Sequence, residues 1–188
     1  MRGWIVTGLL ALAACSPPAA TEKAGETAAA SGCAAEAQVA WAPAGGERFT
    51  IEANSTGADC ANAVATLTIR GADGAVDWTE SRPTHQVMTL AGAADATAMQ
   101  TALSEWIDPT VGNMHTTNAL PAWAANAETP MQGEFAFYPE EGLARAEYEA
   151  LRARNAPLYC FVQGMESLAC LALEDGRLEK IGVQTFPG

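Results

Sequence analysis

Basic residues are scarce in this chain of 188 residues, in which ten lysines and arginines stand against 22 aspartates and glutamates. The formal net charge of −12 repels nucleic-acid phosphates and anionic lipid headgroups, and no basic cluster offsets it. We therefore exclude nucleic-acid binding. Cationic partners are compatible with this charge, but acidity also serves solubility alone.

Motifs for hydrolytic and redox chemistry are missing as well. His85 and His115 are the two histidines, and neither belongs to an HExxH pattern, so a zinc hydrolase is unsupported. Ser167 lacks the second glycine of a GxSxG nucleophile elbow, and no CxxC motif indicates a thiol oxidoreductase. The sequence therefore favours a protein without catalysis, metal or cofactor. An enzyme of an unfamiliar type stays open as an alternative.

Long hydrophobic runs are absent too, since the longest, Trp4 to Ala14, falls well short of a membrane span. As a helix rising about 1.5 Å per residue it reaches roughly 16 Å, about half of a hydrocarbon core. Arg2 precedes it and small residues close it before Cys15. This pattern predicts a cleaved signal peptide, residues 1–14.

The end of this segment, Leu12-Ala13-Ala14-Cys15, matches the lipobox pattern of leucine, two small residues and cysteine. Here, and only here, the chain resembles bacterial lipoproteins. The resemblance implies a diacylglyceryl group on the Cys15 thiol and acylation of its new amino group, and several acyl chains hold a protein on a membrane. Ser16 replaces the aspartate that commonly retains such proteins at the inner membrane, which implies an outer-membrane address facing the periplasm. The alternative is a secreted protein whose cysteine falls there by chance.

Behind the lipidated cysteine, the segment of residues 15–32 contains proline, alanine, threonine and glutamate but no large apolar residue. Such a composition predicts a disordered tether, with a root-mean-square reach of roughly 20 to 25 Å. Residues 33–188 contain the large apolar side chains of tryptophan, phenylalanine, isoleucine and leucine, which can form a hydrophobic core. We expect them to form a single domain facing the periplasm.

Four cysteines remain for this domain: Cys33, Cys60, Cys160 and Cys170. An even number in an oxidising compartment predicts two disulfides, and among the three connectivities we favour the local one, Cys33–Cys60 and Cys160–Cys170. A four-thiolate metal site is the alternative. It is disfavoured because zinc ligands usually come in pairs two to four residues apart.

Apolar periodicity predicts the elements of the domain. Alternation predicts a strand at 48–53, a hairpin at 64–80 and a fourth strand at 85–90, followed by a short strand at 134–138. Met99, Leu103, Trp106 and Ile107 have helical spacing after Asp95, which predicts a helix ending before Pro109.

A second helix is predicted over 140–154, with Leu143, Ala146, Ala150 and Leu151 as its apolar face. The helix would carry two carboxylate pairs, Glu140 with Glu141 and Glu147 with Glu149. A glycosidase needs an acid and a base about 5 to 10 Å apart in a cleft, whereas carboxylates on a helix more often form a solvated face.

The last stretch predicts three antiparallel strands, with turns at 163–167 and 174–177, that lie centrally in the sheet and are covered on both faces. The expected fold class is α+β: a mostly antiparallel sheet with two helices and a C-terminal three-stranded meander, stapled by disulfides.

The loop of residues 109–131 has no sustained period and contains Met114, His115, Leu120 and Trp123 as exposed candidates for partner contact. Structureless loops longer than about 12 to 15 residues are uncommon unless they are functional or disordered. Alternatively, Leu120 and Trp123 plug the end of the core.

Together these features predict a membrane-anchored lipoprotein of the cell envelope that binds another protein or a cell-wall component without catalysis. The alternative is an inhibitor of a cationic lytic enzyme such as lysozyme, which size, acidity and location suggest. A turbidity assay of cell-wall lysis with excess protein distinguishes the two.

Replacing the lipobox cysteine tests the anchor. Because the acyl chains are attached through Cys15, we expect Cys15→Ser to abolish partitioning into the detergent phase while the domain keeps its fold. Mass spectrometry of the N-terminal peptide and detergent phase separation measure this. A wild-type chain recovered soluble and lipid-free would contradict it.

Overall fold

The computed structural model describes residues 32–112 and 114–186, so the predicted signal peptide, Cys15 and nearly all of the tether lie outside the described part. Its strands form two antiparallel sheets instead of one. The first sheet has the order β1-β2-β3-β4, with β1 (Ala35–Trp41), β2 (Phe49–Thr56), β3 (Val64–Arg70) and β4 (Val76–Pro83). The second has the order β5-β6-β9-β8-β7, with β5 (Met131–Gln132), β6 (Phe135–Pro139), β7 (Leu158–Val162), β8 (Ser167–Glu174) and β9 (Arg177–Thr185).

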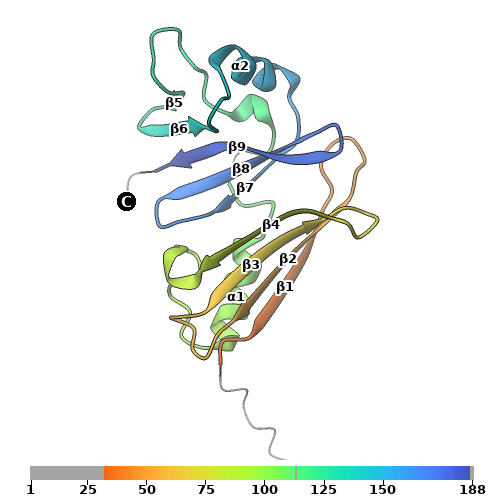
Figure 1. The fold of residues 1–188 in the computed structure, drawn as a ribbon, viewed down its shortest axis with the longest axis vertical. Helices are drawn as coiled ribbons and strands as arrows, with labels where there is room; N and C mark the ends of the chain where they lie inside the picture. The colour runs from red at the N-terminus through yellow and green to blue at the C-terminus, as the bar shows by residue number, and fades with distance from the viewer. Residues whose placement is uncertain (1–31, 113, 187–188) are drawn as a thin grey trace, which may run out of the picture.

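The two sheets and a helix enclose the first hydrophobic core. In Figure 1 the first sheet fills the lower half of the molecule, with α1 (Ala96–Trp106) behind it, and the second sheet lies above. Trp41 of the first sheet contacts Tyr159 of the second, with ring centroids 5.6 Å apart. The predicted α1 is confirmed: the Asp95 side chain accepts a hydrogen bond from the Ala98 amide as N-cap, and Leu103 is buried in the first core.

A second core covers the opposite face of the second sheet. There α2 (Arg145–Arg154), at the top of Figure 1, brings Tyr148 against Phe137 of β6, with ring centroids 5.7 Å apart. Leu158 and Cys170 face this core, whereas Tyr159 and Leu171 face the first. The meander is therefore covered on both faces, as predicted, and the single α+β domain is confirmed.

Both disulfides have the predicted connectivity. Cys33 precedes β1 and bonds to Cys60 in the turn between β2 and β3. Cys160 and Cys170 are direct cross-strand partners on β7 and β8.

The strand predicted at 85–90 is wrong. Residues Thr84–Gln86 form a 3₁₀ turn, η1, and the Leu90 amide donates to the Val87 carbonyl oxygen at 2.9 Å. Val87 and Leu90 are both buried because they stand three residues apart on successive turns, which an alternating pattern does not describe. The Thr84 hydroxyl fixes the turn by donating to the Cys60 carbonyl oxygen at 2.6 Å.

The second helix and the place of the meander also differ from expectation. α2 begins at Arg145, five residues later than predicted, because Gly142 turns the chain with a φ of +92°. Of its predicted apolar face, Ala146 and Ala150 are exposed, and Tyr148 takes the buried place beside Leu151. The meander is not wholly central, since β7 is an edge strand.

Gly182 of β9 allows the second sheet to close against β6. It pairs with Pro139 on one side and Cys170 on the other, at a φ of +154°. A Cβ atom there would stand 2.5 Å from Cε1 of Phe137 and 2.5 Å from the Tyr138 carbonyl oxygen. These neighbours are backbone and a fully buried ring, so neither can give way easily.

We therefore expect Gly182→Ala to lower the free energy of unfolding by about 3 kcal/mol or more. The control is Gly92→Ala, because a Cβ at Gly92 meets nothing within 4 Å, and its effect should stay below about 1 kcal/mol. Urea unfolding with unchanged m-values measures both. Equal stability of the two variants would contradict the packing argument.

Candidate functional site

An apolar groove opens beside β7. Its volume is about 380 Å³, at the small end of the range for ligand pockets. The groove is lined by Met88 and Thr89, by Glu105, Trp106 and Asp108 at the end of α1, by Val111, Gly112 and Met114 of the next loop, and by Cys160, Phe161, Val162 and Leu168 of the meander.

Side chains from both hydrophobic cores form the floor of the groove. Phe161 and Trp106 belong to the first core, with ring centroids 6.3 Å apart in an edge-on arrangement. Met114, Cys160 and Leu168 belong to the second core. The groove therefore crosses the edge of the second sheet, where the two cores meet the surface.

The outer edge of β7 faces this groove. The Gln163 amide donates to the Ser167 carbonyl oxygen at 3.0 Å, and the Pro157 carbonyl oxygen accepts from the Leu173 amide at 2.9 Å. Odd-numbered residues of β7 thus hydrogen-bond to β8, and the even-numbered ones, with Cys160 in the middle, direct their N–H and C=O groups away from it.

Two contacts close this outer edge on either side of Cys160. The Leu158 amide donates to the His115 carbonyl oxygen at 2.9 Å, which covers the start of the strand. Trp106 Nε1 donates to the Val162 carbonyl oxygen at 2.6 Å, which covers its end. These two contacts protect the outer edge of β7 against pairing with another strand.

The mouth of the groove is acidic. Glu105 and Asp108 stand at the C-terminal end of α1, where the helix dipole adds partial negative charge and the last turn has no basic residue. The pKa of Asp108 lies below its ordinary value because the Thr110 amide donates a hydrogen bond to it and the Thr110 hydroxyl a second. Asp108 is therefore an ionised and oriented carboxylate at neutral pH. None of the described lining residues is basic.

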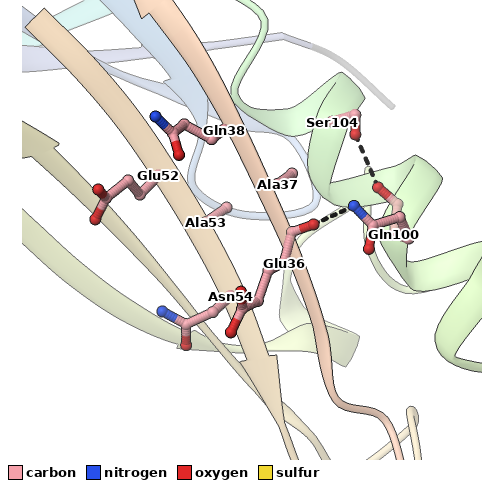
Figure 2. A pocket seen from close by; sticks show the side chains of 8 residues that line it. All are labelled: Glu36, Ala37, Gln38, Glu52, Ala53, Asn54, Gln100 and Ser104. Atoms are coloured by element: carbon pink, nitrogen blue, oxygen red, sulfur yellow. Dashed lines mark hydrogen bonds between the residues drawn. The ribbon is translucent and has the colours of Figure 1, made fainter.

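A second, polar hollow lies beside the edge of the first sheet (Figure 2). Gln100 of α1 donates its side-chain amide to the Glu36 carbonyl oxygen, which ties the helix to the edge strand β1. Of its two carboxylates, Glu52 is paired with Arg70 at 3.0 Å. The hollow is shallow and polar, so it offers a ligand little apolar surface to bury.

The predicted interaction residues divide between core and surface. Met114 and Leu120, predicted to be exposed, are buried in the second core, with exposed fractions of 7% and 2%. The exposure prediction is wrong for these two because α2 and the second sheet need cover at this end. His115 is exposed and Trp123 is half-buried. Met114 alone of the four lines the groove.

Trp123 is held in place by α2. Its ring packs edge-on against Tyr148, with centroids 5.7 Å apart, and its backbone amide donates to Glu149 at 2.5 Å. This hydrogen bond is the main reason that the pKa of Glu149 is lowered, and Arg152 contributes to the same shift. The surroundings of Trp123 thus match the alternative that it plugs the core.

Three of the four carboxylates in the two sequence pairs make structural contacts. Glu140 pairs with Lys180 at 2.8 Å, the Glu147 side chain caps α2 by accepting from the Ala144 amide at 3.1 Å, and Glu149 pairs with Arg152 at 2.7 Å. Among residues 32–112 and 114–186, no group of three or more histidine, cysteine or acidic side chains is placed to hold a metal ion.

Comparisons with protein families, with curated proteins and with solved structures found no match to this chain. Within the described ranges, no helix has both the length and the apolar character to cross a bilayer.

Truncating single side chains of the loop should distinguish the residues that cover the core from the residues that lie on the surface. Because Leu120 is fully buried, we expect Leu120→Ala to lower the free energy of unfolding by about 2 to 5 kcal/mol. His115→Ala is the control, since that side chain is exposed, and should change it by less than about 0.5 kcal/mol. Thermal and urea unfolding measure both values. A neutral Leu120→Ala would contradict the assignment of this loop to the core.

Proposed function

We propose that this protein is a membrane-anchored lipoprotein of the cell envelope that acts as a non-enzymatic binding module, with the groove beside β7 as its ligand site. The observation that carries the proposal is the apolar floor of this groove, open at the surface of a strongly acidic protein. Apolar concavities with a few polar groups are the usual form of binding sites.

The surroundings of the groove support this reading. Met88 and Val111 at its rim are large apolar side chains with exposed fractions of 46% and 65%. Leaving such side chains in water beside an apolar hollow favours association with a partner over stability of the free protein. The floor itself is rigid, because Phe161 and Trp106 are packed in the core.

The anchor and the location rest on other observations. The lipobox at Leu12 to Cys15 supports attachment through lipid, and two disulfides support an oxidising compartment such as the periplasm. Outer-membrane placement rests on Ser16 alone. In this proposal the lipid holds the domain at the membrane and the groove takes the partner.

Adding charge at the rim tests the groove with a neutral apolar dye, Nile red. We expect the dye to bind the wild-type chain and Met88→Glu or Val111→Glu to weaken it about tenfold, because a carboxylate at an apolar rim is costly to desolvate. Fluorescence titration measures the affinity.

The matched control is Val76→Glu on β4. Val76 is as exposed as Met88, at 50%, but it does not line the groove. Its variant should bind the dye like the wild type. Equal dye binding by all three variants would show that the apolar site lies elsewhere and would overturn the proposed function.

A further inference from the structure

We propose that Cys160 is a site of reversible modification by small thiols. A thiol that enters the groove beside β7 forms a mixed disulfide with Cys160 and releases Cys170, and the acidic mouth of the groove favours thiols that carry a positive charge. The inference rests on the exposure of Cys160 and not on the binding function proposed above, so the two can fail separately.

The two disulfides differ in what a dissolved thiol can reach. Cys33 and Cys60 are buried, with exposed fractions of 0% and 6%, and Cys170 is fully buried on β8, an inner strand of its sheet. Cys160 is half-buried on the edge strand β7 and lines the groove. Exchange requires that a thiolate reach one of the bonded sulfur atoms, and exposed disulfides are the labile ones. Cys160 is therefore the point of attack.

The place of the bond in the sheet determines which sulfur leaves. Cys170 has β7 on one side and Gly182 of β9 on the other, and it belongs to the second core, which α2 covers. Met114 and Leu168 belong to the same core but also line the groove, so this core reaches the surface beside Cys160. A thiol from solvent therefore bonds to Cys160, and Cys170 is the leaving group.

The exchange is balanced in atoms and electrons. The incoming thiol loses its proton, and its thiolate sulfur bonds to the Cys160 sulfur as the bond between Cys160 and Cys170 breaks. The electron pair of that bond leaves with the Cys170 sulfur, which takes up one proton and becomes a thiol. One disulfide replaces another, so the step needs no oxidant and no reductant besides the thiol itself.

The strand pairing makes the modification reversible. Five residue pairs hold β7 beside β8, with Cys160 and Cys170 as the middle pair. Tyr159 and Phe161, on either side of Cys160, are buried in the first core, on the face opposite to the disulfide. The strands therefore remain paired after exchange, and the Cys170 thiol stays opposite Cys160. It expels the small thiol again once free thiol is removed from the solution.

The charge of the mouth selects among thiols. Glu105 and Asp108 line the groove at the end of α1, and none of the described lining residues is basic. Asp108 is held in place by Thr110, whose amide and hydroxyl donate to Oδ1 at 2.8 and 2.7 Å. These two carboxylates repel a thiolate that carries a further carboxylate or sulfonate, and they attract an ammonium group. The favoured substrate is therefore a small aminothiol.

Mapping the adducts on the full chain tests the inference. The protein is incubated with cysteamine, 2-mercaptoethanol or 2-mercaptoethanesulfonate, quenched with acid and digested, and mass spectrometry locates each adduct. We expect adducts on Cys160, none on Cys170 and an intact Cys33–Cys60 bond, and removal of the thiol should restore the Cys160–Cys170 bond. Adducts on Cys170, earlier opening of the Cys33–Cys60 bond or the absence of any adduct would each overturn the assignment.

Rates of adduct formation test the charge preference. Each rate is divided by the rate of the same thiol with a small neutral disulfide, which removes differences in nucleophilicity. We expect cysteamine to exceed 2-mercaptoethanesulfonate by about tenfold, and the ratio to shrink as salt rises from about 50 to 500 mM. Glu105→Gln with Asp108→Asn should remove most of the ratio, whereas Glu128→Gln, an exposed acid that does not line the groove, should keep it. Equal normalised rates for the two thiols contradict the preference.

Single variants measure the accessibility of each thiol directly. Cys170→Ser leaves Cys160 as a free thiol, and Cys160→Ser leaves Cys170. We expect iodoacetamide, a neutral reagent, to alkylate Cys160 at least about tenfold faster than Cys170 in the folded chains, and both at the same rate in urea. Equal rates in the folded chains would refute the difference in access. Where a variant does not fold, the adduct map of the wild-type chain decides.

The outcomes separate this inference from the proposed function. If Nile red binds the groove and Cys160 takes up no thiol, the exchange site fails while the proposed function stands. If Cys160 takes up thiol and the dye does not bind, the proposed function fails while the exchange site stands.

Discussion

The strand β8 is buried on both of its faces, and this constraint organises the rest of the molecule. Its residues 169–173 are buried without interruption, with Leu171 in the first core and Cys170 in the second. A strand of this kind needs a layer on each side, because its apolar surface is otherwise left in water. The first sheet with α1 supplies one layer, and α2 with the loop at Leu120 supplies the other. The edge strand β7 is where those two layers end, so the groove is a product of the same constraint.

Much of this fold could be predicted from the sequence, and the successes share one cause. The sequence predicts α1 because Met99 and Leu103 are large and helically spaced. It predicts the meander because residues 158–173 are apolar on both faces of their strands. Small side chains carry a weaker signal. β1 was not predicted, since its buried positions include Ala35 and Ala37, whose alternation with polar residues is hard to distinguish from an alanine-rich tether. The helix over 140–154 was predicted too long because acids and alanines favour a helix, whereas Gly142 determines its start.

The groove could not be predicted, because four separate segments of the chain build it. Of the four residues that the sequence indicates for partner contact, Met114 alone lines it, and the irregularity of its loop is the signal that indicates it. The position of β7 at the sheet edge follows from the strand order, and two contacts cover this edge, His115 to Leu158 and Trp106 to Val162, which no periodicity encodes. The disulfides could be predicted by contrast, since four cysteines allow three connectivities, of which the local one is observed.

The Cys33–Cys60 disulfide has a mechanical consequence. β1 is an edge strand and the first element among the described residues, so any tension on the chain ahead of it acts on β1 before the other strands of its sheet. Without the bond, such a pull would separate β1 from β2 one hydrogen bond at a time. With it, the force passes from Cys33 directly to the turn at Cys60 and is shared between β2 and β3. A pull on the chain ahead of Cys33 therefore leaves the pairing of β1 with β2 unloaded.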